Sequence, residues 1–215
     1  MKNHPLQFLL DQNKMWAAGM TQRDPEFFKK LSQQQAPDYL WIGCADSRVP
    51  ANEIVGLLPG EMFVHRNVAN QVPHTDMNLL CVLQYAVEIL KVKHVIVCGH
   101  YGCGGVRAAL LDNRDYGLLD NWLRLIKDIA LEHETELNTI SDPLKRADRL
   151  CELNVERQVA NLCHTAIVQN AWNRGQPVQV HGWIYGVGDG IIKDLGIAIK
   201  KQREIPEVYR IKPET

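Results

Sequence analysis

The chain has 215 residues, of which 46% are hydrophobic and 23% are charged, and its formal net charge is −1. This length fits one domain over 1–215, and the near-neutral charge gives no reason to expect a nucleic acid or an anionic membrane as partner. No apolar run approaches the roughly 20 residues of a membrane-spanning helix, and the N-terminus lacks a signal-peptide core. We therefore expect a cytoplasmic protein.

The first 35 residues are expected to form a helical arm. Apolar residues recur in it at helical spacing, and Asp24-Pro25 is typical of the start of a second short helix. The arm could pack on a partner subunit or on its own domain, and the sequence favours neither. The apolar positions are Leu6, Leu9, Leu10, Met15, Trp16 and Met20.

From 36 to 200, strands and helices alternate. Apolar or alternating runs predict strands at 38–43, 61–68, 94–98 and 178–185, with a final hairpin at 191–195. Helices are expected at 78–90, at 120–133 and from Asp142-Pro143, and another from a cap at Asn154 to Arg174, with Gly175 as its C-terminal cap. The alternation predicts a doubly wound α/β core with a mostly parallel sheet. Ligands bind such sheets at the carboxyl ends of the strands.

Two motifs with metal-ligand chemistry lie at such strand ends. Cys44 and Asp46 follow the strand 38–43, and His100 and Cys103 follow the strand 94–98. Thiolate, imidazole and carboxylate are ligands that tetrahedral zinc prefers, and the glycines around Cys103 allow a tight loop. Arg48 is the obvious partner for Asp46, because its planar fork holds a carboxylate at two points.

The remaining cysteines and histidines lack ligand-like neighbours in the sequence. We read the four other cysteines as core or ordinary surface thiols, since this composition is not that of a disulfide scaffold. These are Cys81, Cys98, Cys151 and Cys163.

At these residues the chain resembles the β-carbonic anhydrases. The runs WIGCADSRVP, VHRNVAN, CGHYGCGG and HGWIYGV carry the resemblance, which extends from about Gln35 to Gly190. It implies one Zn²⁺ per chain and the interconversion of CO2 and bicarbonate. It also implies a dimer that can pair into a tetramer.

The mechanism that the resemblance implies uses a zinc-bound water, which loses a proton and attacks CO2. Asp46 would have two positions. Paired with Arg48, it orients the hydroxide; released, it moves onto zinc and stops turnover. Gln35 would bind substrate across a dimer interface, with Phe63, Val68 and Tyr85 as the apolar wall and the Gly104 N–H as an anion contact.

A second site is expected near the first. Trp41 and Gly43 share one face of a strand, and with Arg66 and Tyr185 they resemble a bicarbonate site of a bacterial subgroup. Bicarbonate there would favour the closed, Asp-ligated state and so inactivate the enzyme as pH falls or bicarbonate rises. The alternative is that Trp41 and Tyr185 are packing aromatics.

Four other functions remain open at this point. The four ligands could close a purely structural zinc site, against which Arg48 argues. Cys44 and Cys103 could form a redox pair. A nucleotide-binding protein is a third possibility, although HYGCGG is too short for a dinucleotide fingerprint. A hydrolase for carbonyl sulfide or carbon disulfide would fit the same fold.

Overall fold

The computed structural model describes residues 5–33, 35–111 and 114–212. The chain divides into two compact units, 1–36 and 37–215. The described part of the first unit contains two helices, α1 (Gln7–Arg23) and α2 (Phe27–Gln33), which confirms the N-terminal helical arm. Within this unit Trp16 packs edge-on against Phe28, with ring centroids 5.7 Å apart.

The second unit is built on a five-stranded sheet in the order β2-β1-β3-β4-β5. The first four strands are mutually parallel, and β5 pairs antiparallel with β4. This confirms the mostly parallel sheet and the final hairpin. The strands are β1 (Tyr39–Cys44), β2 (Met62–Asn67), β3 (His94–His100), β4 (Gln179–Tyr185) and β5 (Ile192–Ile199).

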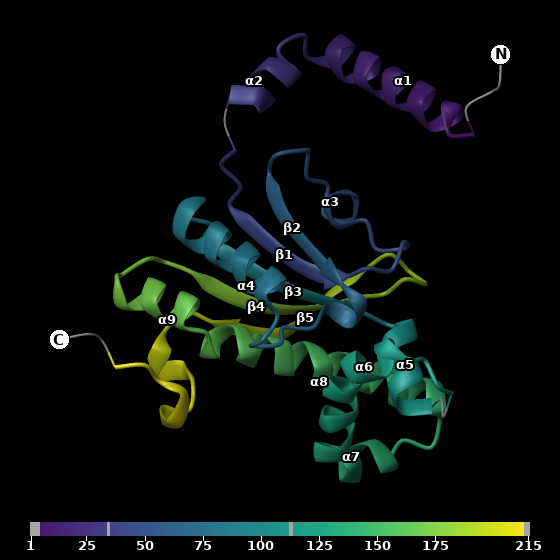
Figure 1. Ribbon diagram of the computed structural model, residues 1–215, viewed down its shortest axis with the longest axis vertical. Coiled ribbons are helices and arrows are strands. Elements are labelled where there is room, and N and C mark those ends of the chain that lie inside the picture. The colour runs from purple at the N-terminus through teal and green to yellow at the C-terminus, as the bar shows by residue number, and fades with distance from the viewer. Residues whose placement is uncertain (1–4, 34, 112–113, 213–215) are drawn as a thin grey trace. The chain divides into compact units, whose positions relative to one another are not determined.

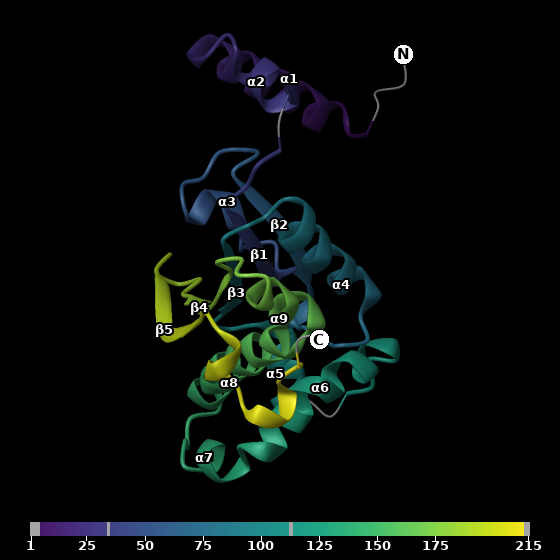
Figure 2. The same cartoon turned by 90° about the vertical axis from the view of Figure 1, so that its left-hand side faces the viewer.

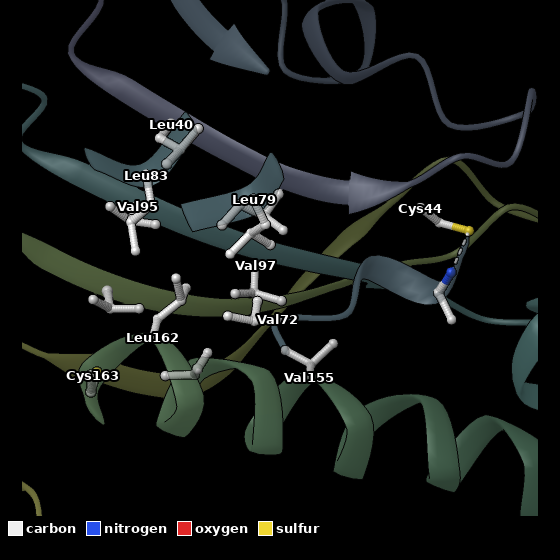
Figure 3. Packing of buried hydrophobic residues seen from close by; sticks show 14 of the residues in the cluster. Leu40, Cys44, Val72, Leu79, Leu83, Val95, Val97, Val155, Leu162 and Cys163 are labelled. Carbon is white, nitrogen blue, oxygen red and sulfur yellow. Dashed lines mark hydrogen bonds between the residues drawn. The ribbon is translucent and has the colours of Figure 1, made fainter. Parts of the chain in front are cut away.

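Helices cover the sheet unequally (Figures 1 and 2). The larger core lies between one face of the sheet and most of the helices, and includes Leu40, Val97 and Leu162 (Figure 3). A smaller cluster around Trp41, Ile96 and Tyr185 occupies the other face with α3 (Ala51–Ile54). The other helices are α4 (Met77–Gln84), η2 (Tyr85–Ile89), α5 (Gly104–Leu111), α6 (Leu118–Glu132), α7 (Glu134–Asn138), α8 (Pro143–His164) and α9 (Ala166–Asn173), with short turns η1 (Val68–Asn70), η3 (Gln202–Glu204) and η4 (Glu207–Tyr209).

The expected helix start at Asn154 is wrong. Helix α8 begins at Pro143, capped by the Asp142 carboxylate, and continues through Asn154 to His164. The Asn154 side chain does not cap a helix because it is buried and bonded to the carbonyl of Ala69. The break comes instead at Thr165, whose hydroxyl accepts the Val168 N–H of α9.

The end of α9 follows the expectation. Gly175 has φ of +77°, and the N–H of Gln176 bonds back to the carbonyl of Ala171. This left-handed glycine terminates the helix because an L side chain there would be strained. None of the helices in the described part of the chain combines the length and apolar composition needed to cross a bilayer.

Candidate metal centre

Three buried ligand groups converge at the carboxyl ends of two neighbouring strands. Cys44 ends β1, His100 ends β3, and Cys103 directly precedes α5. Strands β1 and β3 pair in register, with Gly43 opposite Cys98, so both loops open at the same edge of the sheet. Ligand atoms of the three residues all lie within 4.8 Å of one another.

The geometry of this group fits a zinc ion. The sulfur atoms of Cys44 and Cys103 are 3.9 Å apart, and two sulfurs on a tetrahedral Zn²⁺ at 2.3 Å would be separated by about 3.8 Å. The His100 Nδ1 lies 3.0 Å from the carbonyl oxygen of Tyr101. That contact calls for a proton on Nδ1 and leaves the Nε2 lone pair free. Nε2 is buried and has no hydrogen-bond partner among the described residues. This is expected of a nitrogen whose lone pair binds a metal.

The pKa values of the two thiols are shifted in opposite directions. The hydrogen bond from Cys103 lowers the pKa of Cys44 to about 4 against the effect of burial. That same bond, together with burial, raises the pKa of Cys103 above its usual range. One thiolate therefore forms readily, and a cation would be needed to hold the second.

Asp46 and Arg48 form a two-point ion pair beside the three ligands. Arg48 Nε donates to Asp46 Oδ1 at 2.9 Å, and an Arg48 terminal nitrogen donates to Oδ2 at 2.7 Å. These bonds hold the pKa of Asp46 well below its usual range. The other carboxylate contact is with His100, whose Nε2 lies 3.7 Å from Oδ2. Asp46 thus lies beside the group but is engaged by Arg48.

A layer of contacts behind the ligands was not predicted from the sequence. The Tyr101 hydroxyl donates to Glu152 at 2.5 Å, and the Gly102 N–H donates to Asp148 at 3.1 Å. Asp148 and Glu152 are one turn apart on α8, so they hold the loop between His100 and Cys103 from the same face. Their spacing indicates a shared face, but no local pattern says which loop that face would meet.

The expected substrate residues are only partly brought together. Val68 lies close to Gly105, since a Cβ built on Gly105 would be 2.9 Å from a Val68 methyl carbon. Gly104 is the first residue of α5 and is exposed. Phe63 and Tyr85 contact each other, with ring centroids 5.8 Å apart. However, Phe63 pairs with Leu40, nearer the start of β1 than Cys44 is. Gln35 belongs to the first unit and stays a prediction.

The expected bicarbonate residues lie on and beside the less covered face of the sheet. The Trp41 indole lies over Gly43, where a Cβ would be 2.3 Å from the indole nitrogen. Trp41 and Tyr185 belong to the same buried cluster. The Arg66 Nε donates to the Cys44 carbonyl at 2.9 Å, and its terminal nitrogen reaches the Asp46 carbonyl. Arg66 therefore connects this face to the backbone that carries Cys44 and Asp46.

The other cysteines do not belong to this group of three, although the Cys151 thiol contacts the backbone of Cys103. Burial raises the pKa of Cys151 and Cys163 to about 12 each, and raises that of Cys98 further. Neutral buried thiols of this kind behave as small apolar residues. Within the described residues the group of Cys44, His100 and Cys103 is the one cluster of three or more such side chains that could hold a metal ion.

The chain is similar to known carbonic anhydrases over most of its length. Residues 39–192 match the family model described as carbonic anhydrase. A carbonic anhydrase of Emericella nidulans is 52% identical over 190 residues, covering 88% of this chain and 82% of that relative. A carbonic anhydrase of Saccharomyces cerevisiae is 36% identical over 205 residues, covering 92% of each chain.

Solved structures show the same similarity in three dimensions. A β-carbonic anhydrase of Coccomyxa superposes with a TM-score of 0.90 at 40% identity, covering 94% of this chain and 91% of that one. One of two tetrameric β-carbonic anhydrases of Sordaria macrospora gives a TM-score of 0.86 at 44% identity, with coverages of 90% and 98%.

Proposed function

Because this chain belongs to the carbonic anhydrase family, in its β class, and so carries out the reversible hydration of CO2, we propose how its own residues perform that reaction. The proposal starts from one observation. Cys44, His100 and Cys103 converge on a single buried point, and none of the described residues forms a hydrogen bond with the His100 Nε2. We assign these three side chains as the ligands of one zinc ion per chain.

When bound there, Zn²⁺ would lower the pKa of a water molecule towards neutrality and so supply the nucleophile for CO2. The chain's residues would hold the reacting groups. Asp46 would accept a hydrogen bond from the nucleophile and so orient it. Arg48 would keep the Asp46 carboxylate ionised and fixed through two bonds. The Gly104 N–H, at the start of α5, would contact the bicarbonate anion.

We further assign a switching role to Asp46. Paired with Arg48, as in this structure, it would leave the fourth position free on a zinc ion held by Cys44, His100 and Cys103, which is what a catalytic zinc requires. Rotated away from Arg48, its carboxylate would occupy that position and stop turnover. The 3.7 Å between its Oδ2 and the His100 Nε2 supports this, because the carboxylate already lies beside one of the assigned ligand atoms.

Assembly and location follow from the relatives. We propose a homo-oligomer, a dimer or a tetramer, because related enzymes such as those of Sordaria macrospora are tetrameric. In such an assembly Gln35 would bind substrate across the interface, with Phe63, Val68 and Tyr85 forming apolar walls. A cytoplasmic location also stays a proposal.

Metal analysis combined with CO2 hydration rates tests the function. We expect one zinc per chain and hydration at mildly alkaline pH that falls at mildly acidic pH. A zinc-free active protein would refute the mechanism, and a zinc protein inert at every pH would favour a structural site. Competition by carbonyl sulfide or carbon disulfide would reveal whether either is the better substrate.

We also propose that bicarbonate binds beside Trp41, Gly43, Arg66 and Tyr185 and favours the closed position of Asp46. Two observations support this. Arg66 bonds to the carbonyls of Cys44 and Asp46, so an anion bound to Arg66 would affect the position of Asp46. The buried Trp183 indole N–H has no partner among the described residues, and Trp183 packs edge-on near Trp41.

The test is bicarbonate inhibition of the Trp41→Phe and Tyr185→Phe variants. Each should require more bicarbonate for half inhibition than the wild type, because each loses a hydrogen-bond donor. Tyr209→Phe is the matched control, since Tyr209 stacks on His164 in another part of the second unit. If neither variant changes the inhibition, the two aromatics only pack.

A further inference from the structure

A strained turn lies directly against the metal centre. In the short helical turn η1 after β2, Ala69 has φ of +63° and ψ of +32°, and Asn70 has φ of +47°. This left-handed region is unfavourable for residues with a Cβ. An alanine has no polar side chain that could compensate locally, so the surrounding structure must hold it there.

The unusual conformation directs a backbone N–H at a metal-ligand sulfur. The Ala69 nitrogen donates to the Cys44 Sγ at 3.4 Å, and both residues are buried. Figure 3 shows this bond as a dashed line from the sulfur of Cys44 to a backbone nitrogen at the end of the sheet. An N–H bond to a thiolate withdraws charge from the sulfur, so the sulfur donates less charge to its metal.

The carbonyl of the same residue is held by a buried amide on α8. Asn154 is 1% exposed and its Nδ2 donates to the Ala69 oxygen at 2.9 Å. The Asn154 Oδ1 accepts from Gln158 Nε2 at 2.8 Å, and the Gln158 Oε1 accepts from the Val72 N–H at 2.8 Å.

Backbone groups fix the direction of this chain of bonds. The Ala69 carbonyl can only accept and the Val72 N–H can only donate, so each amide between them has one satisfactory orientation. Asn154 must therefore present its NH₂ group to Ala69. The buried network can hold the strained turn because every member in the chain is paired.

We infer that Asn154 is a positioning residue for the metal centre, which holds the Ala69 peptide so that its N–H stays bonded to the sulfur of Cys44. This rests on the proposed function, in which that sulfur binds zinc. Without Asn154, the turn would relax towards negative φ and the N–H would leave the sulfur. The sulfur would then donate more charge, and the metal would acidify water less.

The test uses cobalt in place of zinc, because Co²⁺ bound to thiolate has an absorption band that reports on the sulfur. In Asn154→Ala this band should move to longer wavelength, since a sulfur without its hydrogen bond is more easily oxidised. With zinc bound, the acid limb of the rate profile should move to higher pH, and kcat at neutral pH should fall about tenfold. Amide exchange over 67–72 should become faster.

Arg146→Ala is the matched control. Arg146 also lies on α8 and donates to a backbone carbonyl, but to that of Ile140, outside the bonds that join Asn154 and Gln158 to the turn. It should leave the cobalt band unchanged. A shift of equal size in this control would overturn the assignment, because the effect would then be general loosening of α8.

A second variant tests whether Asn154 acts through the strained residue. Glycine adopts positive φ without strain, so A69G should keep the wild-type band. In the A69G background, Asn154→Ala should shift the band less than it does alone. Equal shifts in both backgrounds would refute the proposed route.

The inference can still be tested if Asn154→Ala fails to fold. If Asn154→Ala does not bind cobalt, Asn154→Leu keeps a similar volume and removes the donor, and its band should shift in the same direction. An unshifted band in a cobalt-loaded Asn154 variant overturns this inference and leaves the proposed function intact. Failure of the wild-type protein to bind zinc or cobalt would instead overturn the proposed function.

Discussion

At the scale of single residues, the site depends on groups whose partners fix their chemical form. The Tyr101 carbonyl selects the His100 tautomer that leaves Nε2 available. Arg48 does the same for Asp46, because two charge-assisted bonds hold the carboxylate ionised. Asp46 and Arg48 are close in sequence, so this pair was predicted, whereas the tautomer of His100 was not.

The lowered pKa of Asp46 gives a pH prediction. A carboxylate whose folded pKa is depressed contributes stability above its unfolded pKa, near 3.8, and that contribution is lost as pH falls through the lower folded value. Asp46 therefore stays ionised at mildly acidic pH. We expect that any inactivation between about pH 5 and 7 reflects where Asp46 lies and not its protonation. Infrared difference spectra over this range test this. A protonated carboxyl signal that appears in the wild type but not in Asp46→Asn would belong to Asp46, and we expect no such signal.

The same residue gives a rate prediction. Asp46→Asn should lower kcat/KM about 100-fold while zinc content is unchanged, because an amide cannot pair with both Arg48 nitrogens and so would not be held where it orients the nucleophile. Stopped-flow hydration assays measure this. Asp128→Asn, at an exposed position on α6, should behave like the wild type. Full activity of the Asp46 variant would remove Asp46 from the mechanism.

At the scale of elements, α8 organises the site without supplying a ligand. One face carries Asp148 and Glu152, which hold the loop after β3. Another carries Asn154 and Gln158, which hold the turn after β2. The apolar positions between them, such as Val155, pack on the sheet (Figure 3). The stability of this helix therefore bears on both loops.

The cap of α8 can be tested directly. The Asp142 carboxylate accepts the N–H groups of Leu144 and Lys145 at 2.8 and 3.3 Å. Asp142→Ala should lower the free energy of unfolding by about 1 kcal/mol. Urea unfolding at fixed protein and zinc concentration measures it. Asp128→Ala, inside α6, removes the same charge without removing a cap and should not destabilise the protein; equal losses would contradict the capping role.

The end of α9 offers a second test. A Cβ added at Gly175 or at Gly188 would meet nothing within 4 Å, but only Gly175 has a left-handed φ. Gly175→Ala should therefore cost about 1 kcal/mol through the backbone alone. Gly188→Ala should stay within about 0.5 kcal/mol of the wild type. Thermal unfolding of the two variants compares them, and similar losses would show that φ is not the cause.

At the scale of the whole molecule, the metal would join loops that are distant in sequence. Cys44 and His100 are brought together by the pairing of β1 with β3. A ligand that binds only the folded arrangement stabilises it, by about 2.7 kcal/mol at a free concentration 100 times its Kd. Zinc should therefore contribute to global stability as well as to catalysis.

Metal removal tests this contribution. Chelation should lower the unfolding temperature by about 5–10 °C. Added Zn²⁺ should restore it, and Mg²⁺ should not, because two thiolates and an imidazole suit zinc and not magnesium. Differential scanning calorimetry at one protein concentration measures both. If the chelated and zinc-loaded proteins unfold at the same temperature, the native state does not bind zinc at this site.

Local patterns in the sequence were enough for the mostly parallel sheet, the meeting of Cys44, His100 and Cys103 at one edge of it, the Asp46–Arg48 pair and the glycine at the end of α9. Each depends on neighbours along the chain or on strand ends, which parallel pairing brings to one edge. The continuous course of α8 and the left-handed Ala69 were decided only by tertiary structure. Asn154 is a good helix cap in isolation, but burial gave its amide a partner on a distant turn, and no local rule contains that contact.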